Sequence, residues 1–482
     1  MRNYSCVTIL IETALSCATV GDIISLQVGD GYAEIQYMPV KKEDAGFYGW
    51  WLLPILCLVY SIPIGFALYG PPVIYTFMVK DLGWQRGEVN VGYSIIGIML
   101  GVGALAIPWL INRFGPRKTL AIGGVIITVF CVLMAWLAHI CLTAFGHSYP
   151  VVYWALCFFV GLGLSFSTVV PIQALVLLWF NVHRALALGL VLGGGAIGGF
   201  IYPQIVSNCI VAFGDDWRVG WYVIALACLA GAVIALIAVR NRPEDLGQHP
   251  DGLSPQDEQA AIAHARHRLI KTYRTPVNWA FGDAVRTRAL WLIVGATGLI
   301  YFLWQAVLTQ TPAHMLDRGF SPTDPQLVFH PAFIYGLILA CSIIGRLSIS
   351  FLGEKTEARY LIAVAGFSLV VGGVLFIMAS TSNLWAAYIF PLLSGFGFGA
   401  AYVATPLIVG NYFGAASFPS ISRITNPINS IFQFTSPAFA GFMFDIYGSY
   451  DAAMYIAGAG GLIGVVLILF CTPPRPRTGP SC

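Results

Sequence analysis

Residues 89–111, VNVGYSIIGIMLGVGALAIPWLI, precede the basic segment NRFGPRK at 112–118 and a second apolar stretch, TLAIGGVIITVFCVLMAWLAHICLT, at 119–143. Neither apolar stretch contains Asp, Glu, Lys or Arg. About 18 or more consecutive apolar residues can cross the ~30 Å hydrocarbon core of a bilayer, so each stretch predicts a membrane span. The basic segment between them would form a tight loop at one membrane surface.

The rest of the chain has the same character. Of its 482 residues, 58% are hydrophobic and 10% are charged, whereas a soluble domain is roughly 25% charged. We therefore expect lipid as its solvent and predict an all-α integral membrane protein with twelve transmembrane helices. The twelve apolar blocks cover about residues 51–79, 89–111, 119–143, 151–180, 185–213, 219–239, 289–313, 331–352, 360–380, 384–411, 416–441 and 452–471.

The basic residues predict the orientation of these spans. An even number of spans puts both termini on one side, and Lys and Arg are retained in cytoplasmic loops. With the N-terminus inside, most of the 25 lysines and arginines fall in cytoplasmic segments. Arg346 falls inside a span, and the opposite side holds only Lys80, Arg86, Arg218 and Arg318. We expect both termini to be cytoplasmic and the protein to lie in a plasma membrane or bacterial inner membrane.

The chain also repeats itself at a spacing of 234 residues. The pairs are Gly161 and Gly395, Pro203 and Pro437, Gly214 and Gly448, and Trp221 and Tyr455. This spacing aligns blocks four to six with blocks ten to twelve and predicts two pseudo-symmetric six-helix bundles, which could rock about a site between them. The expected organisation is an N-terminal extension (1–46), a first bundle (47–240), a cytoplasmic central loop (241–288), a second bundle (289–471) and a tail (472–482).

The N-terminal extension contains no block long enough to span a membrane. Its basic start, apolar centre and cleavage site are too poorly developed for a signal peptide. Met38, followed by PVKKEDAGFYGWW, would make a natural start of translation. Our hypothesis is that residues 1–37 are a disordered extension or an artefact of start assignment. Mass spectrometry of the N-terminus of natively expressed protein would test it.

Several classes of function are disfavoured. A net charge of +3 without a clustered basic face argues against a nucleic-acid partner. Eleven cysteines without a CxxC pair predict neither a disulfide framework nor a metal site. His264 and His267 fall in a polar segment that could begin a helix at Ser254, and a solvated helix is favoured there over metal binding. We expect no cofactor.

Two other classes of protein compare poorly with a transporter. A membrane enzyme should carry a reactive constellation at membrane depth, and a scaffold protein should bring a sizeable soluble domain; the sequence shows neither. The glycine-rich run LGGGAIGGF at 192–200 lies within a span, where small residues indicate close helix packing rather than a phosphate loop.

The segment PWLINRFGPRK at 108–118 resembles the signature of the major facilitator superfamily, a glycine, three residues and then Asp-Arg-x-Gly-x-Arg-Lys. Pro108 and Asn112 depart from that signature. The resemblance implies a cytoplasmic gate, which should be weaker or differently built here because the aspartate is missing. The implied gate residues are Asn112, Arg113, Gly115, Arg117 and Lys118, with a fainter copy in the second half at Glu354 and Lys355.

Further motifs narrow the resemblance. FYGWW at 47–51, LGW at 82–84, RALALG at 184–189, RPEDLG at 242–247 and GR at 345–346 are similar to the branch of oxalate–formate antiporters and monocarboxylate transporters. The similarity covers roughly residues 47–471. It implies a secondary transporter for a small organic anion, with a substrate-binding arginine at Arg346.

Physical chemistry gives Arg346 two possible roles. An ionised group within a bilayer costs at least ~2.5–3.5 kcal/mol, so it normally faces a cavity or a partner. A guanidinium also binds a carboxylate through two parallel hydrogen bonds. Alternatively, Arg346 lies about six residues, or ~9 Å, from the inner end of its span and could snorkel to the cytoplasm. We favour the substrate site.

One fixed positive charge in the cavity matches one carboxylate better than two, so we expect a monoanion, and proton coupling through a buried carboxylate has no obvious carrier. All 22 acids fall outside the apolar blocks or at their ends, and Ser342 stands one turn before Arg346 where animal monocarboxylate transporters have an acid. The oxalate-type members carry a second basic residue in span eleven, where this chain offers polar groups. Further candidates for substrate contacts are Tyr69, Gln305, Ser342, Tyr402, Asn429 and Gln433.

The sequence leaves several properties open. The coupling partner could be a proton or a counter-anion, and the carrier could work by antiport, symport or uniport. We expect it to work as a monomer surrounded by membrane lipid. The alternative within transport is a superfamily exporter or a carrier of a neutral or sugar-like substrate. Replacing Arg346 by Gln separates the two, because only a carboxylate carrier should lose uptake.

Overall fold

The computed structural model describes residues 23–29, 32–38, 47–137, 139–141, 150–181, 183–253, 273, 275, 277–324, 326, 330–353, 355–414 and 417–474. The chain divides into two units, Met1–Tyr48 and Gly49–Cys482. The helix predicted to begin at Ser254, His264, His267, Glu354 and most of the C-terminal tail lie outside the described residues.

The first unit contains an antiparallel pair of strands, which corrects the expectation of a wholly disordered extension. Strand β1 (Ile23–Gly29) pairs with β2 (Tyr32–Met38), with Ile23 opposite Met38 and Gly29 opposite Tyr32. Both strands are rich in β-branched and aromatic residues, and the sequence between them is Asp30-Gly31. Asp-Gly between two such strands is a strong local signal for a β-hairpin, and it is independent of the hydrophobic blocks that indicate membrane spans.

Helices of the N-terminal half, taken as residues 47–241 so that it includes Asn241 just after the last helix, fold next to one another. They are α2 (Tyr48–Ile62), the π-helical turn η1 (Pro63–Leu68), α3 (Pro71–Leu82), α4 (Arg86–Gly103), the short η2 (Ala104–Ala106), α5 (Ile107–Ala135), α7 (Pro150–Ser167), α8 (Val169–Trp179), α9 (Arg184–Ala212) and α10 (Trp217–Ala238). Helix α5 packs against α10 and α7, and α4 packs against α7.

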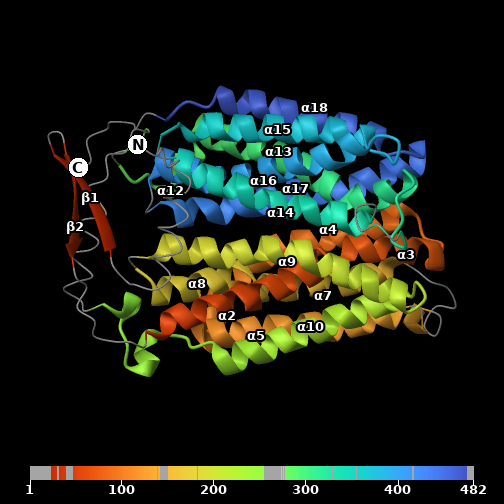
Figure 1. The fold of residues 1–482 in the computed structure, drawn as a ribbon, viewed down its shortest axis with the longest axis horizontal. Coiled ribbons are helices and arrows are strands. Elements are labelled where there is room, and N and C mark those ends of the chain that lie inside the picture. The colour runs from red at the N-terminus through yellow and green to blue at the C-terminus, as the bar shows by residue number, and fades with distance from the viewer. Residues whose placement is uncertain are drawn as a thin grey trace, which may run out of the picture. The chain divides into compact units, whose positions relative to one another are not determined.

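Helices of the C-terminal half, defined as residues 289–471, group in the same way. They are α13 (Arg288–Asp317), α14 (Pro331–Leu352), α15 (Ala358–Met378), α16 (Leu384–Phe413), α17 (Phe418–Tyr447) and α18 (Asp451–Leu469). Figure 1 shows α13–α18 together, coloured from green (α13) to blue (α18), and the helices of the N-terminal half in red to yellow-green. The halves meet chiefly where α4 packs against α17 and α9 against α14.

Ten of the helical runs are long and apolar enough to cross a membrane by length and composition. Two of the twelve predicted blocks are merged in the run Arg86–Ala135, where Gly115 interrupts the helical backbone at φ 79° and ψ 160°. Helix α17 corresponds to the eleventh block and is not among the ten. Its 30 residues include four serines, two threonines, two asparagines and a glutamine, which lower its apolar character.

Glycines from the predicted repeat make equivalent close contacts in the two halves. A Cβ on Gly161 of α7 would lie 2.4 Å from the carbonyl oxygen of Ile96 in α4, and one on Gly395 of α16 would lie 2.2 Å from that of Ile338 in α14. Gly214 and Gly448 both end helices with φ values of +80° and +72°. In contrast, Trp221 is buried whereas Tyr455 is 64% exposed.

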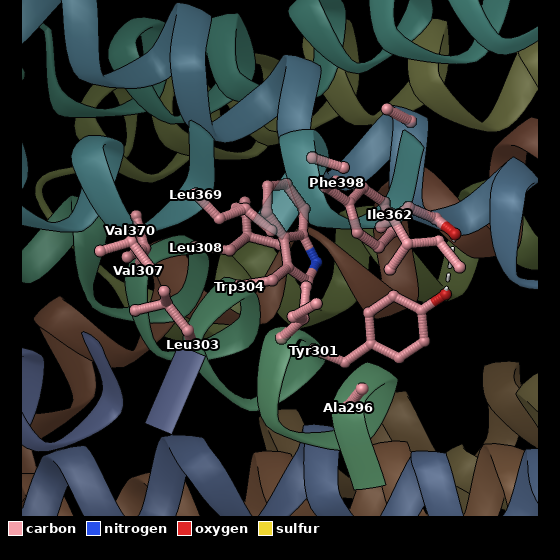
Figure 2. Packing of buried hydrophobic residues seen from close by; sticks show 14 of the residues in the cluster. Ala296, Tyr301, Leu303, Trp304, Val307, Leu308, Ile362, Leu369, Val370 and Phe398 are labelled. Atoms are coloured by element: carbon pink, nitrogen blue, oxygen red, sulfur yellow. Dashed lines mark hydrogen bonds between the residues drawn. The ribbon is translucent and has the colours of Figure 1, made fainter. Parts of the chain in front are cut away.

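Large apolar side chains fill the C-terminal half. Trp304 of α13 stacks on Phe398 of α16, with ring centroids 4.0 Å apart and planes within 2°. Figure 2 shows these two rings among Leu303, Val307, Leu308, Leu369 and Val370, all buried. The Tyr301 hydroxyl hydrogen-bonds the Thr405 hydroxyl at 2.9 Å, so this polar group is satisfied within the apolar cluster.

The described residues of the central loop form two short 3₁₀ turns, η3 (Pro243–Leu246) and η4 (Pro250–Gly252), and the short helix α12 (Phe281–Val285). Asp251 is buried, and its carboxylate accepts hydrogen bonds from the backbone N–H groups of Asn181 and His183, at 2.6 and 3.1 Å. This contact ties the loop to the segment between α8 and α9.

Candidate functional site

Arg346 lies where the two halves face each other. It comes from α14, and its Nη1 donates a hydrogen bond to the backbone oxygen of Leu192 in α9, at 3.2 Å. The guanidinium carbon also lies 5.2 Å from the centre of the Tyr402 ring in α16, close enough for a cation–π contact. Arg346 is half-buried and extends across the interface toward α9.

The glycine-rich run of α9 makes room for two tyrosine rings near this arginine. A Cβ on Gly195 would lie 2.7 Å from Cε1 of Tyr60, and one on Gly199 would lie 2.9 Å from Cδ2 of Tyr69. A larger side chain at either position would therefore displace a ring. The packing role predicted for the run is retained, and its partners here are aromatic rings as well as helix backbone.

Tyr69 follows a local change in helix geometry. Pro63–Leu68 form a π-helical turn, and the Tyr69 N–H bonds to the carbonyl oxygen of Ile64, five residues back, at 3.0 Å. Single π-helical turns are rare and occur frequently at functional sites. Tyr60 and Tyr69 pack against Gly195 and Gly199, about one and two turns along α9 from the Leu192 carbonyl that Arg346 reaches. Arg346, Tyr402, Tyr60 and Tyr69 are called here the Arg346 group.

A second polar group joins the halves through amides. Gln433 of α17 donates from Nε2 to Oε1 of Gln305 in α13, at 2.8 Å. Gln305 in turn donates from Nε2 to the hydroxyl of Tyr93 in α4, at 3.3 Å. The sequence predicted both glutamines as candidates, and the structure brings them together.

Two other predicted residues point elsewhere. The Ser342 hydroxyl is fully buried and donates to the Leu339 carbonyl of its own helix, at 2.6 Å. Asn429 is buried and pairs through Nδ2 with the Thr297 hydroxyl of α13, at 3.2 Å. Asn429 thus makes an interhelical pair of the kind that stabilises membrane bundles. Neither residue joins the Arg346 group in this structure.

Among the predicted cytoplasmic gate residues, Arg117 and Gly115 form hydrogen bonds within their own half. Gly115 separates the two spans, and the Arg117 N–H donates to Oδ1 of Asn241, at 3.0 Å. The Arg117 side chain donates to the carbonyl oxygen of Leu236, at the end of α10. Arg113 lies 5.9 Å over the ring of Phe114. In the described part of the chain, the hydrogen bonds of residues 112–118 all remain in the N-terminal half.

At the end of the bundle opposite the 112–118 loop, an ion pair joins the two halves. Arg86, at the start of α4, donates from Nη1 and Nη2 to both carboxylate oxygens of Asp317 at the end of α13, at 2.6 and 2.7 Å. Such a two-pronged pair is a strong form of ion pair. The same guanidinium lies 3.9 Å over the Phe444 ring of α17. We call this the Arg86 cluster, and this side of the bundle the Arg86 end.

Asp445 and Tyr450 complete the Arg86 cluster. The Asp445 carboxylate accepts from the backbone N–H groups of Arg86 and Gly87, at 3.1 and 2.7 Å, so an acid of one half caps a helix of the other. A negative charge is favourable at a helix N-terminus. Arg86 also donates to the Tyr450 hydroxyl at 2.9 Å. Burial raises the pKa of Tyr450 to about 12, so this phenol stays neutral at physiological pH.

Sequence reasoning missed the Arg86 cluster. In the sequence, Arg86 indicates only the orientation of the spans, and Asp317 and Asp445 are among the acids that fall outside the apolar blocks or at their ends. One signal was available, because all three lie at ends of spans that should reach the same membrane surface. Within the described residues, no group of three or more His, Cys, Asp or Glu side chains could hold a metal ion.

The Major Facilitator Superfamily model matches residues 55–432, and the chain belongs to this superfamily. It is therefore a multi-pass membrane transporter and not an enzyme. The resemblance inferred from the loop motif is confirmed.

Two relatives and one solved structure define the likeness further. The chain is 23% identical over 380 residues to "Monocarboxylate transporter 12-B" of Danio rerio, covering 74% of this chain and 73% of the relative. It is 22% identical over 434 residues to "Probable sulfoacetate transporter SauU" of Cupriavidus necator, covering 88% and 93%. A crystal structure of a point mutant of the nucleoside transporter NupG matches with a TM-score of 0.65 at 12% identity and covers 87% and 99%; it supports the fold alone.

Proposed function

We propose that this transporter is a secondary active carrier that moves a small organic anion, of the monocarboxylate class, by alternating access. The observation that carries the proposal is the Arg346 guanidinium, which lies between α14 and α9 at the meeting of the two halves. A guanidinium presents five N–H groups in a planar fork that matches a carboxylate. In this position it would contact a substrate that passes between the halves.

The surroundings of Arg346 favour one carboxylate over two. Tyr402, Tyr60 and Tyr69 supply aromatic faces and hydroxyl groups but no second positive charge. The names of the relatives agree with an acidic cargo, since one is a monocarboxylate transporter and the other a probable sulfoacetate transporter. A single fixed cation matches the single charge of a monocarboxylate.

The proposed topology has twelve spans with both termini in the cytoplasm, arranged as two six-helix bundles joined by the central loop. Ten helical runs meet the length and composition test. Gly115 divides one of them into two spans, and α17 supplies the twelfth despite its polar residues. With this orientation, the Arg86 end is extracellular and the 112–118 loop is cytoplasmic.

The contacts at the Arg86 end and at the 112–118 loop indicate which conformational state of the transport cycle the structure represents. At the Arg86 end, Arg86, Asp317 and Asp445 link the halves through charged hydrogen bonds. At the 112–118 loop, Arg117 bonds to Asn241 and Leu236 of its own half. We propose that this is the inward-facing state, closed outside, and that the cycle breaks the Arg86 cluster and joins the halves near the 112–118 loop.

Transport in proteoliposomes tests the substrate class. Arg346→Gln should lose uptake of the transported carboxylate by about 100-fold, because about 3 kcal/mol of paired, charge-assisted hydrogen bonding is removed. The matched control is Arg423→Gln, which removes an exposed arginine near the start of α17. A labelled monocarboxylate panel, with and without a pH gradient or internal counter-anion, identifies both the cargo and the coupling partner.

One observation favours a second candidate, a carrier of a neutral or sugar-like substrate. Gln433, Gln305 and Tyr93 form a hydrogen-bonded amide and hydroxyl chain across the two halves, which suits a neutral polar cargo. For such a carrier, Arg346→Gln would leave uptake nearly unchanged. That outcome would contradict the carboxylate proposal while leaving the carrier architecture intact.

A further inference from the structure

A pocket of about 100 Å³ lies beside the Arg86–Asp317 pair, apart from the Arg346 group. Helices α3 and α4 of the N-terminal half line it on one side, and α13 and Tyr450 of the C-terminal half on the other. Its polar lining includes Lys80, Arg86, Asn90, Gln310 and Asp317. A single water needs about 10–15 Å³, so this space can hold a small organic ion.

The charges at the pocket favour an anion. Lys80 is exposed, and no carboxylate of the described residues lies within 4.0 Å of its ammonium. The adjacent Asp81 instead pairs with Arg218 at 3.7 Å and accepts from the Trp217 indole at 2.7 Å. Two cations, Lys80 and Arg86, therefore face one carboxylate, that of Asp317.

The amides of the pocket wall are already engaged by protein groups. Asn90 donates from Nδ2 to the Arg86 carbonyl at 2.8 Å. Gln310 donates from Nε2 to Oδ1 of Asn90 at 3.2 Å and to the Pro437 carbonyl at 3.3 Å. The wall is thus held in place across α4, α13 and α17, and the charged side chains at its rim determine the chemistry of an incoming ligand.

We propose that this pocket is an extracellular binding site for the carboxylate that the protein transports, and that its occupation opens the Arg86 cluster. The inference rests on the proposed function. Lys80 would attract the incoming anion, whose carboxylate would then replace that of Asp317 on the Arg86 fork. Because one carboxylate replaces another, Arg86 stays paired while the link between the halves breaks. A ligand that binds the opened arrangement better shifts the protein toward it.

A cysteine at the pocket wall can report occupation directly. Thr76 lines the pocket and is half-buried, and Thr76→Cys can be modified from outside with a membrane-impermeant methanethiosulfonate. We expect external lactate to slow this modification about three- to tenfold, and the neutral analogue lactamide to leave it unchanged. The protein without Thr76→Cys gives the background from its own cysteines.

Lys80 supplies the matched variants. In the Thr76→Cys background, Lys80→Gln should abolish protection by lactate, and Lys80→Arg, which keeps the charge, should retain it. In the protein that keeps threonine at position 76, Lys80→Gln should raise the half-saturating external concentration of the transported carboxylate by about three- to tenfold. Equal protection by lactate and lactamide, or protection that survives Lys80→Gln, would overturn the inference.

Arg346→Gln separates failure of this inference from failure of the proposed function. In the Arg346→Gln, Thr76→Cys protein, uptake should be lost while lactate still protects the cysteine. If the protein with Arg346 intact transports carboxylates but lactate never protects the cysteine, the pocket proposal is wrong and the proposed function stands. If no carboxylate is transported but protection persists, the pocket binds anions and the proposed function is wrong.

Discussion

Arg346 carries a permanent charge at a place where a charge is costly, and its contacts indicate how that cost is met. One N–H donates to the Leu192 carbonyl, and the guanidinium lies over the Tyr402 ring. Both contacts hold the fork in a defined orientation between the halves. If Arg346 binds the cargo as proposed, a guanidinium fixed in this way loses little side-chain entropy on binding a carboxylate.

Tyr402 offers a test of this orientation. Tyr402→Phe keeps an aromatic face beneath Arg346, whereas Tyr402→Ala removes it. We expect Tyr402→Phe to transport with nearly unchanged half-saturation, and Tyr402→Ala to raise the half-saturating concentration about five- to tenfold, since a cation–π contact contributes about 1 kcal/mol. Concentration dependence of uptake in proteoliposomes measures both. A large loss in Tyr402→Phe would instead assign the role to the hydroxyl.

The sequence predicted part of the site at the residue scale. Arg346 could be picked out because an arginine within an apolar block is rare and expensive. Tyr60 could not, because a tyrosine in a span has no cost that marks it, and its place in the group depends on the gap that Gly195 leaves. Ser342 remains a predicted candidate, but its hydroxyl bonds to its own helix in this structure, which one turn of spacing does not reveal.

At the scale of elements, small residues control how closely helices approach. Gly161 and Gly395 stand at the same positions of the predicted repeat, and each faces a backbone carbonyl of a neighbouring helix. Lipid supplies no hydrophobic force between spans, so such close packing contributes much of the stability of a membrane bundle. The equivalence of the two contacts supports the proposed duplication.

These glycines predict matched effects on stability. Gly161→Ala and Gly395→Ala would place a Cβ 2.4 and 2.2 Å from a carbonyl oxygen, so the helices must move apart. Each should cost about 1–3 kcal/mol. Gly458→Ala of α18 is the control, since nothing lies within 4 Å of its added Cβ. Thermal unfolding in detergent should show lower Tm values for the first two only; an equal change in all three would contradict the packing argument.

Local geometry was harder to predict than the spans themselves. The apolar blocks located the helices because burial in lipid demands long hydrophobic runs. The π-helical turn before Tyr69 leaves no mark on hydrophobicity, and it depends on packing around Pro63–Leu68. The β1–β2 hairpin was missed for a different reason, since its Asp30-Gly31 signal is local and was passed over in a segment expected to be disordered.

At the scale of the molecule, the two halves are connected by different chemistry at different depths. Charged groups join them at the Arg86 end, the Gln433–Gln305–Tyr93 chain joins them within the bundle, and Arg346 reaches Leu192 across the α9–α14 contact. An exposed ion pair is weakened by water and salt. We therefore expect the Arg86 end to open at a modest energetic cost, as the proposed alternating access requires.

This reasoning predicts how the conformational equilibrium responds to Asp317→Asn. The substitution removes the charge that holds Arg86 while keeping side-chain size, and with 34% of the Asp317 side chain exposed we expect a loss of about 1 kcal/mol. The population open at the Arg86 end should rise about fivefold. Ser94→Cys can report it, because Ser94 is buried and accepts from the Ala438 N–H of the other half.

The readout is the rate at which an external, membrane-impermeant thiol reagent modifies Ser94→Cys, compared with and without Asp317→Asn. The matched control is Glu357→Gln, which breaks the 3.0 Å pair with Arg359 inside the C-terminal half and should leave the rate unchanged. A similar rise in both variants would indicate general loosening of the bundle. No rise with Asp317→Asn would mean that the Asp445 cap and the Phe444 and Tyr450 contacts suffice to keep this end closed.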